Sequence, residues 1–182
     1  MRVIETALAG VLLIEPQLSW DARGHVYESW NQRAFARATG IDCCFVQDNH
    51  SRSSRGVLRG LHFQVRQPQG KLVRVVRGAV FDVVVDVRRS SPSFGRWIGI
   101  ELSEENRRQL WIPCGFAHGF LVVSEIADVL YKLTDYYAPE HERSLLWNDP
   151  QVGVAWPLEG IEPVLSAKDA AGVPLARCEV FE

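Results

Sequence analysis

Short apolar segments, separated by glycine, proline and polar turns, run through most of the chain beyond residue 70. They lie at residues 72–76, 79–87, 97–102, 109–112, 120–123, 128–134 and 144–147. Segments of this length that are rich in β-branched or alternating apolar residues are typical of antiparallel strands. Only Arg77 and Gly78 separate the first two segments, and this spacing predicts a β-hairpin around a tight turn.

The N-terminal part contains the clearest helix signal in the chain. Residues 3–16 predict one or two opening strands, interrupted at Gly10, and residues 26–28 predict another short strand. Ser29 and Gln32 have the spacing of a capping box, and the segment Asn31–Thr39, closed by Gly40, predicts an α-helix. A strand over residues 45–50 and a helical turn over residues 103–106 complete the expected elements. The pattern predicts a mainly β domain over residues 1–182, an antiparallel sandwich or barrel with one or two short helices.

Composition and charge narrow the kind of partner. The chain has 182 residues, is 47% hydrophobic and carries a net charge of −2, which argues against broad nucleic-acid binding. The apolar run Ala7–Ile14 is too short to span a bilayer, so no membrane association is expected. Two of the four cysteines, Cys43 and Cys44, are adjacent, and no CxxC spacing occurs. These features favour a reducing, cytoplasmic setting.

The segment 56–64, followed by Lys71, holds the most concentrated candidate chemistry. His62 stands between Leu61 and Phe63, and alternation along a strand points its imidazole away from those two apolar neighbours. Arg59 precedes it by three residues. An isolated histidine on a half-buried strand is more often structural than catalytic, so other motifs must decide.

A second motif, P-x-G-x-x-H, ends at His118. It and the glycine-to-histidine spacing from Gly56 to His62 resemble the paired motifs of the cupin superfamily, a double-sheet jelly roll with its site in the barrel mouth. Cupin metal sites usually use two histidines and a glutamate from the first motif and one histidine from the second. Here Gln64 replaces the second histidine, and Gln69 stands near the expected glutamate. Two histidines are too few for a closed or catalytic metal site, which favours a metal-free barrel.

Without a metal, the side chains suit proton transfer at a carbon beside a ketone. His62 carries an imidazole, a group whose ordinary pKa suits a base that works near neutrality, and Lys71 or His118 can face the forming enolate oxygen. Tyr131, in the middle of a predicted strand, can return a proton as an acid. A carboxylate that orients the histidine would strengthen the base. The residues alone leave five candidates for that role: Asp48, Asp82, Asp86, Asp135 and Asp169.

Cationic and aromatic residues point to a phosphorylated, base-containing ligand. The cations form a set suited to bidentate phosphate recognition: Arg23, Arg52, Arg55, Arg59 and Lys71. A solvated basic face is an equally good interpretation for Arg52 and Arg55. Tyr136 and Tyr137 can stack on a base or simply cover a barrel end.

Nine segments together resemble the dTDP-4-dehydrorhamnose 3,5-epimerase family, cupin-fold enzymes of nucleotide-sugar metabolism. One of them is Gly56-Val57-Leu58-Arg59-Gly60-Leu61-His62. The others are residues 45–51, 69–74, 91–95, 110–113, 115–120, 131–143, 147–150 and 165–169. The resemblance covers residues 3 to 169.

The resemblance implies a role for each site residue. His62 would be the base, with Asp169 as its partner, Lys71 beside the enolate and Tyr131 as the acid on the opposite face. Tyr137 would stack on the thymine. The remaining substrate-binding residues would be Arg23, Glu28, Gln47, Asn49, Arg59, His118, Glu142 and Lys168.

The implied reaction is epimerisation at C3 and C5 of dTDP-4-dehydro-6-deoxy-D-glucose, which gives dTDP-4-dehydro-L-rhamnose without a cofactor. Members of the family are typically homodimers that share strands. His25, Val26 and Phe63 depart from the aromatic pattern of the family and bear on substrate specificity. The alternatives are a single-centre 3- or 5-epimerase of a related dTDP-sugar in a secondary-metabolite pathway, a non-catalytic sugar-nucleotide-binding cupin and a metal-dependent cupin oxygenase.

Overall fold

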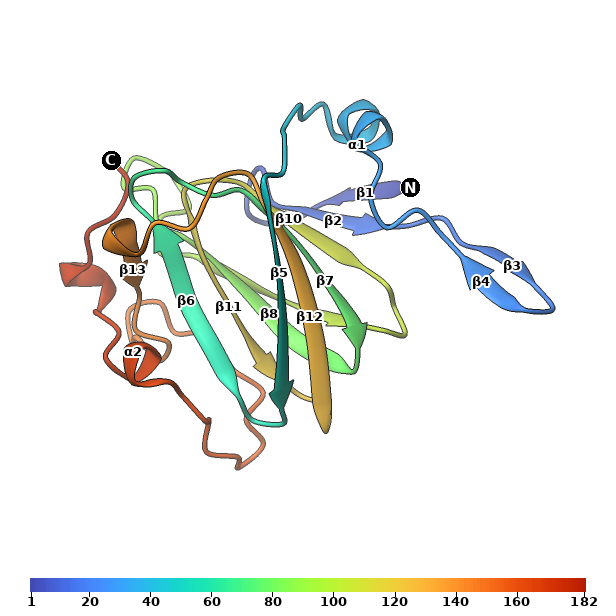
Figure 1. The fold of residues 1–182 in the computed structure, drawn as a ribbon. Helices are drawn as coiled ribbons and strands as arrows, with labels where there is room; N and C mark the ends of the chain where they lie inside the picture. Colours follow the sequence, from blue (N-terminus) through green and yellow to red (C-terminus); the bar gives the residue numbers. More distant parts are fainter.

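Two antiparallel β-sheets face each other in the computed structural model, which describes residues 1–182 (Figure 1). The six-stranded sheet has the order β1 (Arg2–Glu5), β2 (Leu12–Glu15), β10 (Gln109–Ile112), β7 (Lys71–Arg77), β12 (Ile126–Leu133) and β5 (Gln47–Ser54). The five-stranded sheet has the order β13 (Glu142–Ser144), β6 (Leu58–Gln64), β11 (Phe116–Val122), β8 (Ala79–Asp86) and β9 (Trp97–Ser103). The mainly β architecture predicted from the sequence is therefore observed.

Six further short elements lie outside the two sheets or at their ends. The helices are α1 (Gln32–Thr39) and α2 (Ala167–Ala170), with 3-10 turns at Pro139–His141 and Leu175–Arg177. Strands β3 (Ser19–Asp21) and β4 (Gly24–Val26) form a separate hairpin. No helix is long and apolar enough to cross a membrane.

The predicted hairpin of the segments 72–76 and 79–87 is wrong. β7 pairs with β10 and β12 in one sheet, whereas β8 pairs with β11 and β9 in the other. Gly78 between them has a φ of +70°, and a Cβ there would lie 1.9 Å from the carbonyl oxygen of Ile126. The chain therefore uses this glycine to cross between the two sheets in a space that no side chain can share.

Other boundaries shift by a few residues. The helix over 31–39 is confirmed, but its cap is Asn31, whose Oδ1 accepts from the Ala34 N–H at 3.0 Å; the Ser29 capping box is wrong. The strand predicted over 45–50 is β5, which begins at Gln47 and continues to Ser54. The segment 103–106 ends β9 and turns without forming a helix. His118 lies on strand β11.

Apolar side chains fill both sides of the five-stranded sheet. Fifteen buried residues, among them Val73, Val84 and Phe120, form the core between the two sheets. A second cluster includes Leu61 and Phe63 of β6 and packs against the C-terminal segment. That segment runs beside β6 in Figure 1 (orange to red). Because the outer face of β6 is covered in this way, the side chains that alternate with Leu61 and Phe63 face the interior of the barrel.

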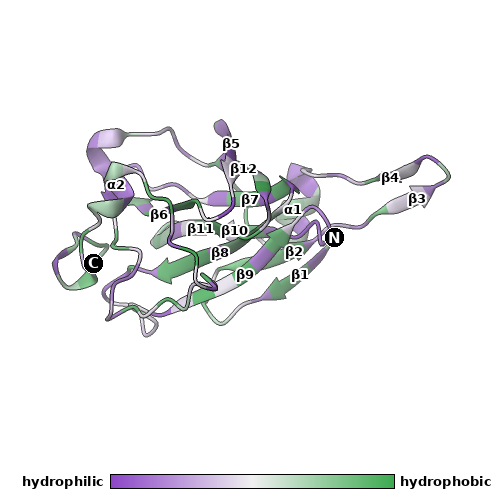
Figure 2. Cartoon of the chain, turned by 90° about the horizontal axis from the view of Figure 1, so that it is seen from below, coloured by the Kyte–Doolittle hydropathy of each residue, from purple (hydrophilic) through white to green (hydrophobic).

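The β3–β4 hairpin projects away from the two sheets. Figure 1 shows it extending beyond the body of the molecule, and Figure 2 shows the same projection from below. Its apolar side chains are open to solvent, with Trp20 65% and Val26 69% exposed. An exposed apolar arm of this kind is a feature of surfaces that contact another molecule.

Candidate active site

A cavity of about 510 Å³ opens between the sheets on the side where β6 and β12 face each other. All the predicted site residues except Arg23 and Glu28 line it. The predicted residues in the lining are Gln47, Asn49, Arg59, His62, Lys71, His118, Tyr131, Tyr137, Glu142, Lys168 and Asp169. Gln69, Gly119, Phe120, Leu133 and Ser166 complete the lining and were not among the predicted site residues.

His62 forms a short hydrogen bond with a buried carboxylate. Its Nε2 lies 2.6 Å from Oδ1 of Asp169. Ser166, which caps α2, donates its hydroxyl to the other oxygen of Asp169 at 2.7 Å. Burial alone would raise the pKa of Asp169, but the hydrogen bonds from His62 and Ser166 outweigh it and hold that pKa below its usual value. Of the five aspartates left open by the sequence, the structure brings Asp169 to His62.

The second nitrogen of His62 faces another carboxylate. Nδ1 lies 3.9 Å from Oε1 of Glu142. The other oxygen of Glu142 accepts hydrogen bonds from the Tyr137 hydroxyl at 2.8 Å and from Lys168 Nζ at 2.9 Å. Burial would raise the pKa of Glu142, yet these two donors and the nearby His62 lower it. Since Nε2 is engaged with Asp169, Nδ1 is the nitrogen of His62 that is available to take a proton from a ligand.

Lys71 is a buried ammonium group at the base of the cavity. Its Nζ donates to the carbonyl oxygen of His62 at 3.1 Å, which leaves further donor capacity for a ligand. Burial lowers its pKa to about 8, against the opposing attraction of Glu142 and Asp82. Lys71 is therefore mostly protonated at neutral pH, but it is a stronger acid than an ordinary lysine.

Tyr131 approaches the cavity from the opposite wall. It lies on β12 of the six-stranded sheet, paired with Asn49 and Val73, whereas His62 lies on β6 of the five-stranded sheet. The Tyr131 hydroxyl forms no hydrogen bond within the chain. Tyr131 and His62 line the same cavity from its two sides. A proton can therefore be taken on one side of a bound ring and returned on the other.

His118 lies directly opposite His62 in the β11–β6 register and forms its own pair with an aspartate. Its Nε2 lies 3.0 and 2.9 Å from the two carboxylate oxygens of Asp82. Burial lowers the pKa of His118, although Asp82 opposes this shift. Asp82, one of the five candidate partners of His62, is thus the partner of the other histidine. An acid in the interior of a strand rich in valine was the sequence signal for a special role.

Arg59 is the only arginine of the predicted cationic set that lines the cavity. Its Nε donates to the hydroxyl of buried Ser53 at 3.0 Å, which leaves the terminal nitrogens for a ligand. Arg23 instead pairs with Asp21 on the projecting hairpin at 2.6 Å. Glu28 accepts a hydrogen bond from Asn31 at 2.8 Å near the start of α1. Arg23 and Glu28 therefore do not line the cavity of their own chain.

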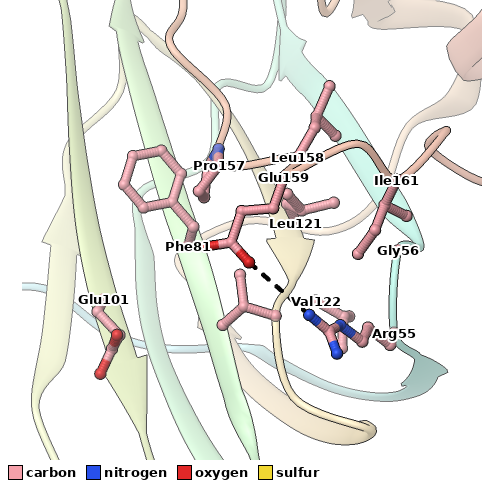
Figure 3. Close-up of a pocket in the computed structure, with 11 residues that line it drawn as sticks. Arg55, Gly56, Phe81, Glu101, Leu121, Val122, Pro157, Leu158, Glu159 and Ile161 are labelled. Carbon is pink, nitrogen blue, oxygen red and sulfur yellow. Dashed lines mark ion pairs between the residues drawn. The ribbon is translucent and has the colours of Figure 1, made fainter.

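Arg52 and Arg55 belong to other parts of the surface. Arg52 makes two hydrogen bonds of 2.8 Å to Asp128, on the outer face of the six-stranded sheet. Arg55 faces Glu159 at 3.9 Å across a separate cavity of about 260 Å³, shown in Figure 3. The structure thus favours the surface interpretation of Arg52 and Arg55, which do not join Arg59 and Lys71 in the cavity.

The residues at the cupin ligand positions do not fit a metal centre. Gln64 uses its amide to hold neighbouring backbone, donating to the carbonyl of Gln67 at 2.7 Å and accepting from the N–H of Ala138 at 2.9 Å. His62 and His118 are each bonded to an aspartate, and the chain has no group of three or more histidine, cysteine or acidic residues placed to hold a metal ion.

The fold is a cupin-type double-sheet barrel, and its cavity brings together a histidine–aspartate pair, a buried lysine and a tyrosine on the facing wall, side chains of the kind that proton transfer beside a carbonyl group requires. The sequence matches the family model described as dTDP-4-dehydrorhamnose 3,5-epimerase over residues 5–177. The chain belongs to this family. Its fold and its enzyme class, an isomerase, are those that the resemblance implied.

Individual relatives support the same placement. A dTDP-4-dehydrorhamnose 3,5-epimerase from Pseudomonas aeruginosa is 58% identical over 181 residues, covering 100% of this chain and 99% of that protein. The crystal structure of a dTDP-6-deoxy-D-glucose-3,5-epimerase from Legionella pneumophila, in complex with dTDP-4-keto-L-rhamnose, has a TM-score of 0.94 at 53% identity and covers 97% of this chain and 93% of that chain. A 3′-monoepimerase from Streptomyces bikiniensis, in complex with dTDP-quinovose, has a TM-score of 0.89 at 37% identity, with 97% and 88% coverage.

Proposed function

We propose that the protein epimerises dTDP-4-dehydro-6-deoxy-D-glucose at C3 and C5 and so produces dTDP-4-dehydro-L-rhamnose, a step of dTDP-rhamnose biosynthesis. Family membership supports the substrate. The observation that carries the chemistry is the 2.6 Å contact between His62 and Asp169 in a cavity whose facing wall holds Tyr131. No cofactor is needed, because both hydrogens are acidified by the ketone at C4.

His62 is the base in this proposal. Nδ1 takes the proton from the carbon beside the ketone, and the C–H electrons move into an enolate at C4. Asp169 accepts the hydrogen bond from Nε2–H and stabilises the imidazolium, while Lys71 donates to the enolate oxygen. Tyr131 then gives its proton to the carbon from the opposite face, and proton exchange with solvent restores both residues.

One base suffices for two carbons. In a D-gluco ring the hydrogens on C3 and C5 lie on the same face, so a single histidine on that face can remove each in turn. Tyr131, on the other wall, serves the opposite face at both carbons. His62 therefore has to lose its first proton before the second step begins.

The nucleotide is held nearer the mouth of the cavity. Arg59 and Lys168 supply positive charge for the diphosphate, and Tyr137, whose ring is half-exposed at the rim, stacks on the thymine. Gln47 and Asn49, which are hydrogen-bonded to each other at 3.0 Å, offer further polar contacts. Glu142 holds Tyr137 and Lys168 in place from below.

The configuration of the product tests the substrate and the number of centres. Purified protein given dTDP-4-dehydro-6-deoxy-D-glucose is expected to invert both C3 and C5, as read by NMR coupling constants of the isolated sugar. Inversion at C3 alone would instead indicate a monoepimerase, like the Streptomyces bikiniensis relative. An unchanged substrate with folded protein would contradict the proposed reaction.

Replacing Tyr131 by phenylalanine is expected to separate proton removal from correct reprotonation. The base remains, so hydrogen exchange with solvent continues at a measurable rate, but the acid on the opposite face is lost and inversion slows by about 10²-fold. The ratio of exchange to inversion, measured by NMR in deuterated water, therefore rises. An unchanged ratio would remove Tyr131 from the role of acid.

We infer that the protein works as a homodimer in which the β3–β4 hairpin reaches the partner. The hairpin projects from the body and exposes Trp20 and Val26, and Arg23 at its tip lies outside the cavity of its own chain (Figure 1). Delivery of Arg23, with Glu28 behind it, to the cavity of a second copy would complete the predicted set of ligand contacts. A closed two-fold dimer then carries two identical shared sites.

Mixed dimers test this sharing. Dimers formed from His62→Ala and Arg23→Ala subunits contain one complete site each, because the first subunit still has its hairpin and the second still has its base. Each variant alone is expected to have low activity. Random mixing makes about half of the dimers mixed, each with one of its two sites complete, so the mixture is expected to regain about one quarter of wild-type activity. If Arg23 acts within its own chain or not at all, the mixture shows only the average of its parents.

We also infer a reducing, cytoplasmic setting for the protein. All four cysteines are unpaired, and Cys44 and Cys114 are exposed. Exposed thiols persist where the surroundings are reducing. The partner is then a cytoplasmic nucleotide sugar, with no nucleic acid or membrane involved.

A further inference from the structure

Asp82 is a fully buried carboxylate that the proposed reaction does not use. It lies on β8, where Val80 and Val84 on the same face belong to the core between the sheets. Its exposed fraction is 0%, and His118 is its only side-chain partner. Burial of an ionised carboxylate is costly unless it is paired, so the pair with His118 accounts for its presence in the barrel.

His118 has one nitrogen fixed and the other free. Nε2 is held by both oxygens of Asp82, whereas Nδ1 forms no hydrogen bond within the chain. The solvent-inaccessible side-chain nitrogen and oxygen atoms without a hydrogen-bond partner are Ser51 Oγ and Trp111 Nε1. Nδ1 of His118 is not one of them, so this unpartnered atom is accessible to solvent. Because His118 lines the cavity, Nδ1 is the atom that it presents to a ligand.

The partner of Nε2 decides what Nδ1 can do. An ionised carboxylate only accepts, so the proton of a neutral His118 must lie on Nε2. Burial lowers the pKa of His118, and the nearby Lys71 and His62 act in the same direction, against Asp82. The imidazole is therefore neutral near pH 7 and offers a lone pair, not a proton, at Nδ1.

We propose that Asp82 is a positioning residue: it fixes the Nε2–H tautomer of His118, so that Nδ1 accepts a hydrogen bond from a ring hydroxyl of the sugar. This inference rests on the proposed substrate. An acceptor at Nδ1 cannot donate to the enolate oxygen, which leaves that role to Lys71. Of the two donors that the sequence left open for the enolate, Lys71 and His118, the geometry assigns Lys71.

The acceptor at Nδ1 of His118 bears on which sugars the site binds. A buried acceptor that is satisfied only by a hydroxyl discriminates strongly against a sugar that lacks that group, because the acceptor is then left without a partner. His118 and Asp82 would thus select the hydroxylated ring, while His62 and Lys71 perform the chemistry. Two histidine–aspartate pairs on adjacent strands would then have different tasks.

Nitrogen-15 NMR of protein labelled at histidine tests the tautomer directly in the wild-type enzyme. At pH 7, His118 is expected to show a protonated Nε2 and an unprotonated Nδ1, both free and with bound dTDP-glucose as a stable probe. A protonated Nδ1 in the bound state, as imidazolium or as the other tautomer, would overturn the proposal. The readout does not depend on turnover, so it is distinct from a failure of the proposed reaction.

A double-mutant cycle tests whether Asp82 acts through His118. Asp82→Asn keeps the size of the side chain but no longer fixes the tautomer, and kcat/KM is expected to fall by about 10- to 100-fold. In a His118→Asn background the same change should have little further effect, because the residue that Asp82 positions is gone. Additive losses in the double variant would show a merely structural role. If Asp82→Asn does not fold, the wild-type NMR measurement still decides.

Discussion

Alanine in place of His62 is expected to lower kcat for epimerisation by about 10³-fold or more, the largest effect of any single replacement. The change removes the imidazole whose Nδ1 is proposed to take the proton, and it leaves Asp169 without the side chain that it orients. Steady-state rates with dTDP-4-dehydro-6-deoxy-D-glucose measure it. Thermal unfolding of the variant shows that the fold is retained.

His50→Ala is the matched control for this prediction. His50 lies on the outer face of β5, with its Nε2 3.3 Å from Asp128, and does not line the cavity. Its replacement removes the same side chain at a half-exposed site and is expected to leave kcat unchanged. Comparable losses in both variants would mean that the effect of His62→Ala is not catalytic.

The second large effect concerns Lys71 and pH. Its pKa is lowered to about 8, mainly by burial, and only the protonated form can donate to the enolate oxygen. As pH rises through this value the ammonium is lost, so kcat is expected to decline on the alkaline side of about pH 8. Lys71→Met lowers kcat by about 10²- to 10³-fold and abolishes that alkaline decline. A pH–rate profile of both proteins gives the comparison.

Lys168→Met serves as the control for charge alone. Lys168 is half-exposed at the cavity mouth, where its Nζ contacts Glu142. Its replacement is expected to raise KM for the nucleotide sugar while the alkaline limb of kcat stays in place. An alkaline limb that persists in Lys71→Met would assign that limb to another group and refute the role of Lys71.

The strands could be predicted from the sequence, but their partners could not. Residues 71–77 and 79–86 carry the apolar pattern of strands whichever neighbour they take. The hairpin prediction failed at Gly78, because a two-residue connection also suits a chain that passes from one sheet to the other. Pairing is decided by contacts between distant segments, and local spacing does not contain that information.

Local features of the candidate site could be predicted from the sequence, whereas contacts between distant residues could not. The inward direction of His62 follows from Leu61 and Phe63, which are buried on the opposite face as alternation requires. Its partner Asp169 lies 107 residues away, so nothing local could distinguish it from Asp82. Family resemblance supplied that choice.

The positions of the arginines could not be predicted from the sequence. A run of cations along the sequence does not reveal which face of a strand each one occupies, and only Arg59 lines the cavity. Arg52 is drawn to Asp128 on the outer face. Arg23 lies on a projecting arm, and the role proposed for it requires a second copy of the chain. Neither the sequence nor one chain alone supplies that context.

We propose that His62 is the single base for both carbons. Hydrogen exchange in deuterated water, followed by NMR at C3 and C5 of the substrate, tests it most directly. The wild-type protein is expected to introduce deuterium at both carbons, and His62→Ala at neither. Deuterium that still enters one carbon in the folded His62→Ala variant would reveal a second base and contradict the claim.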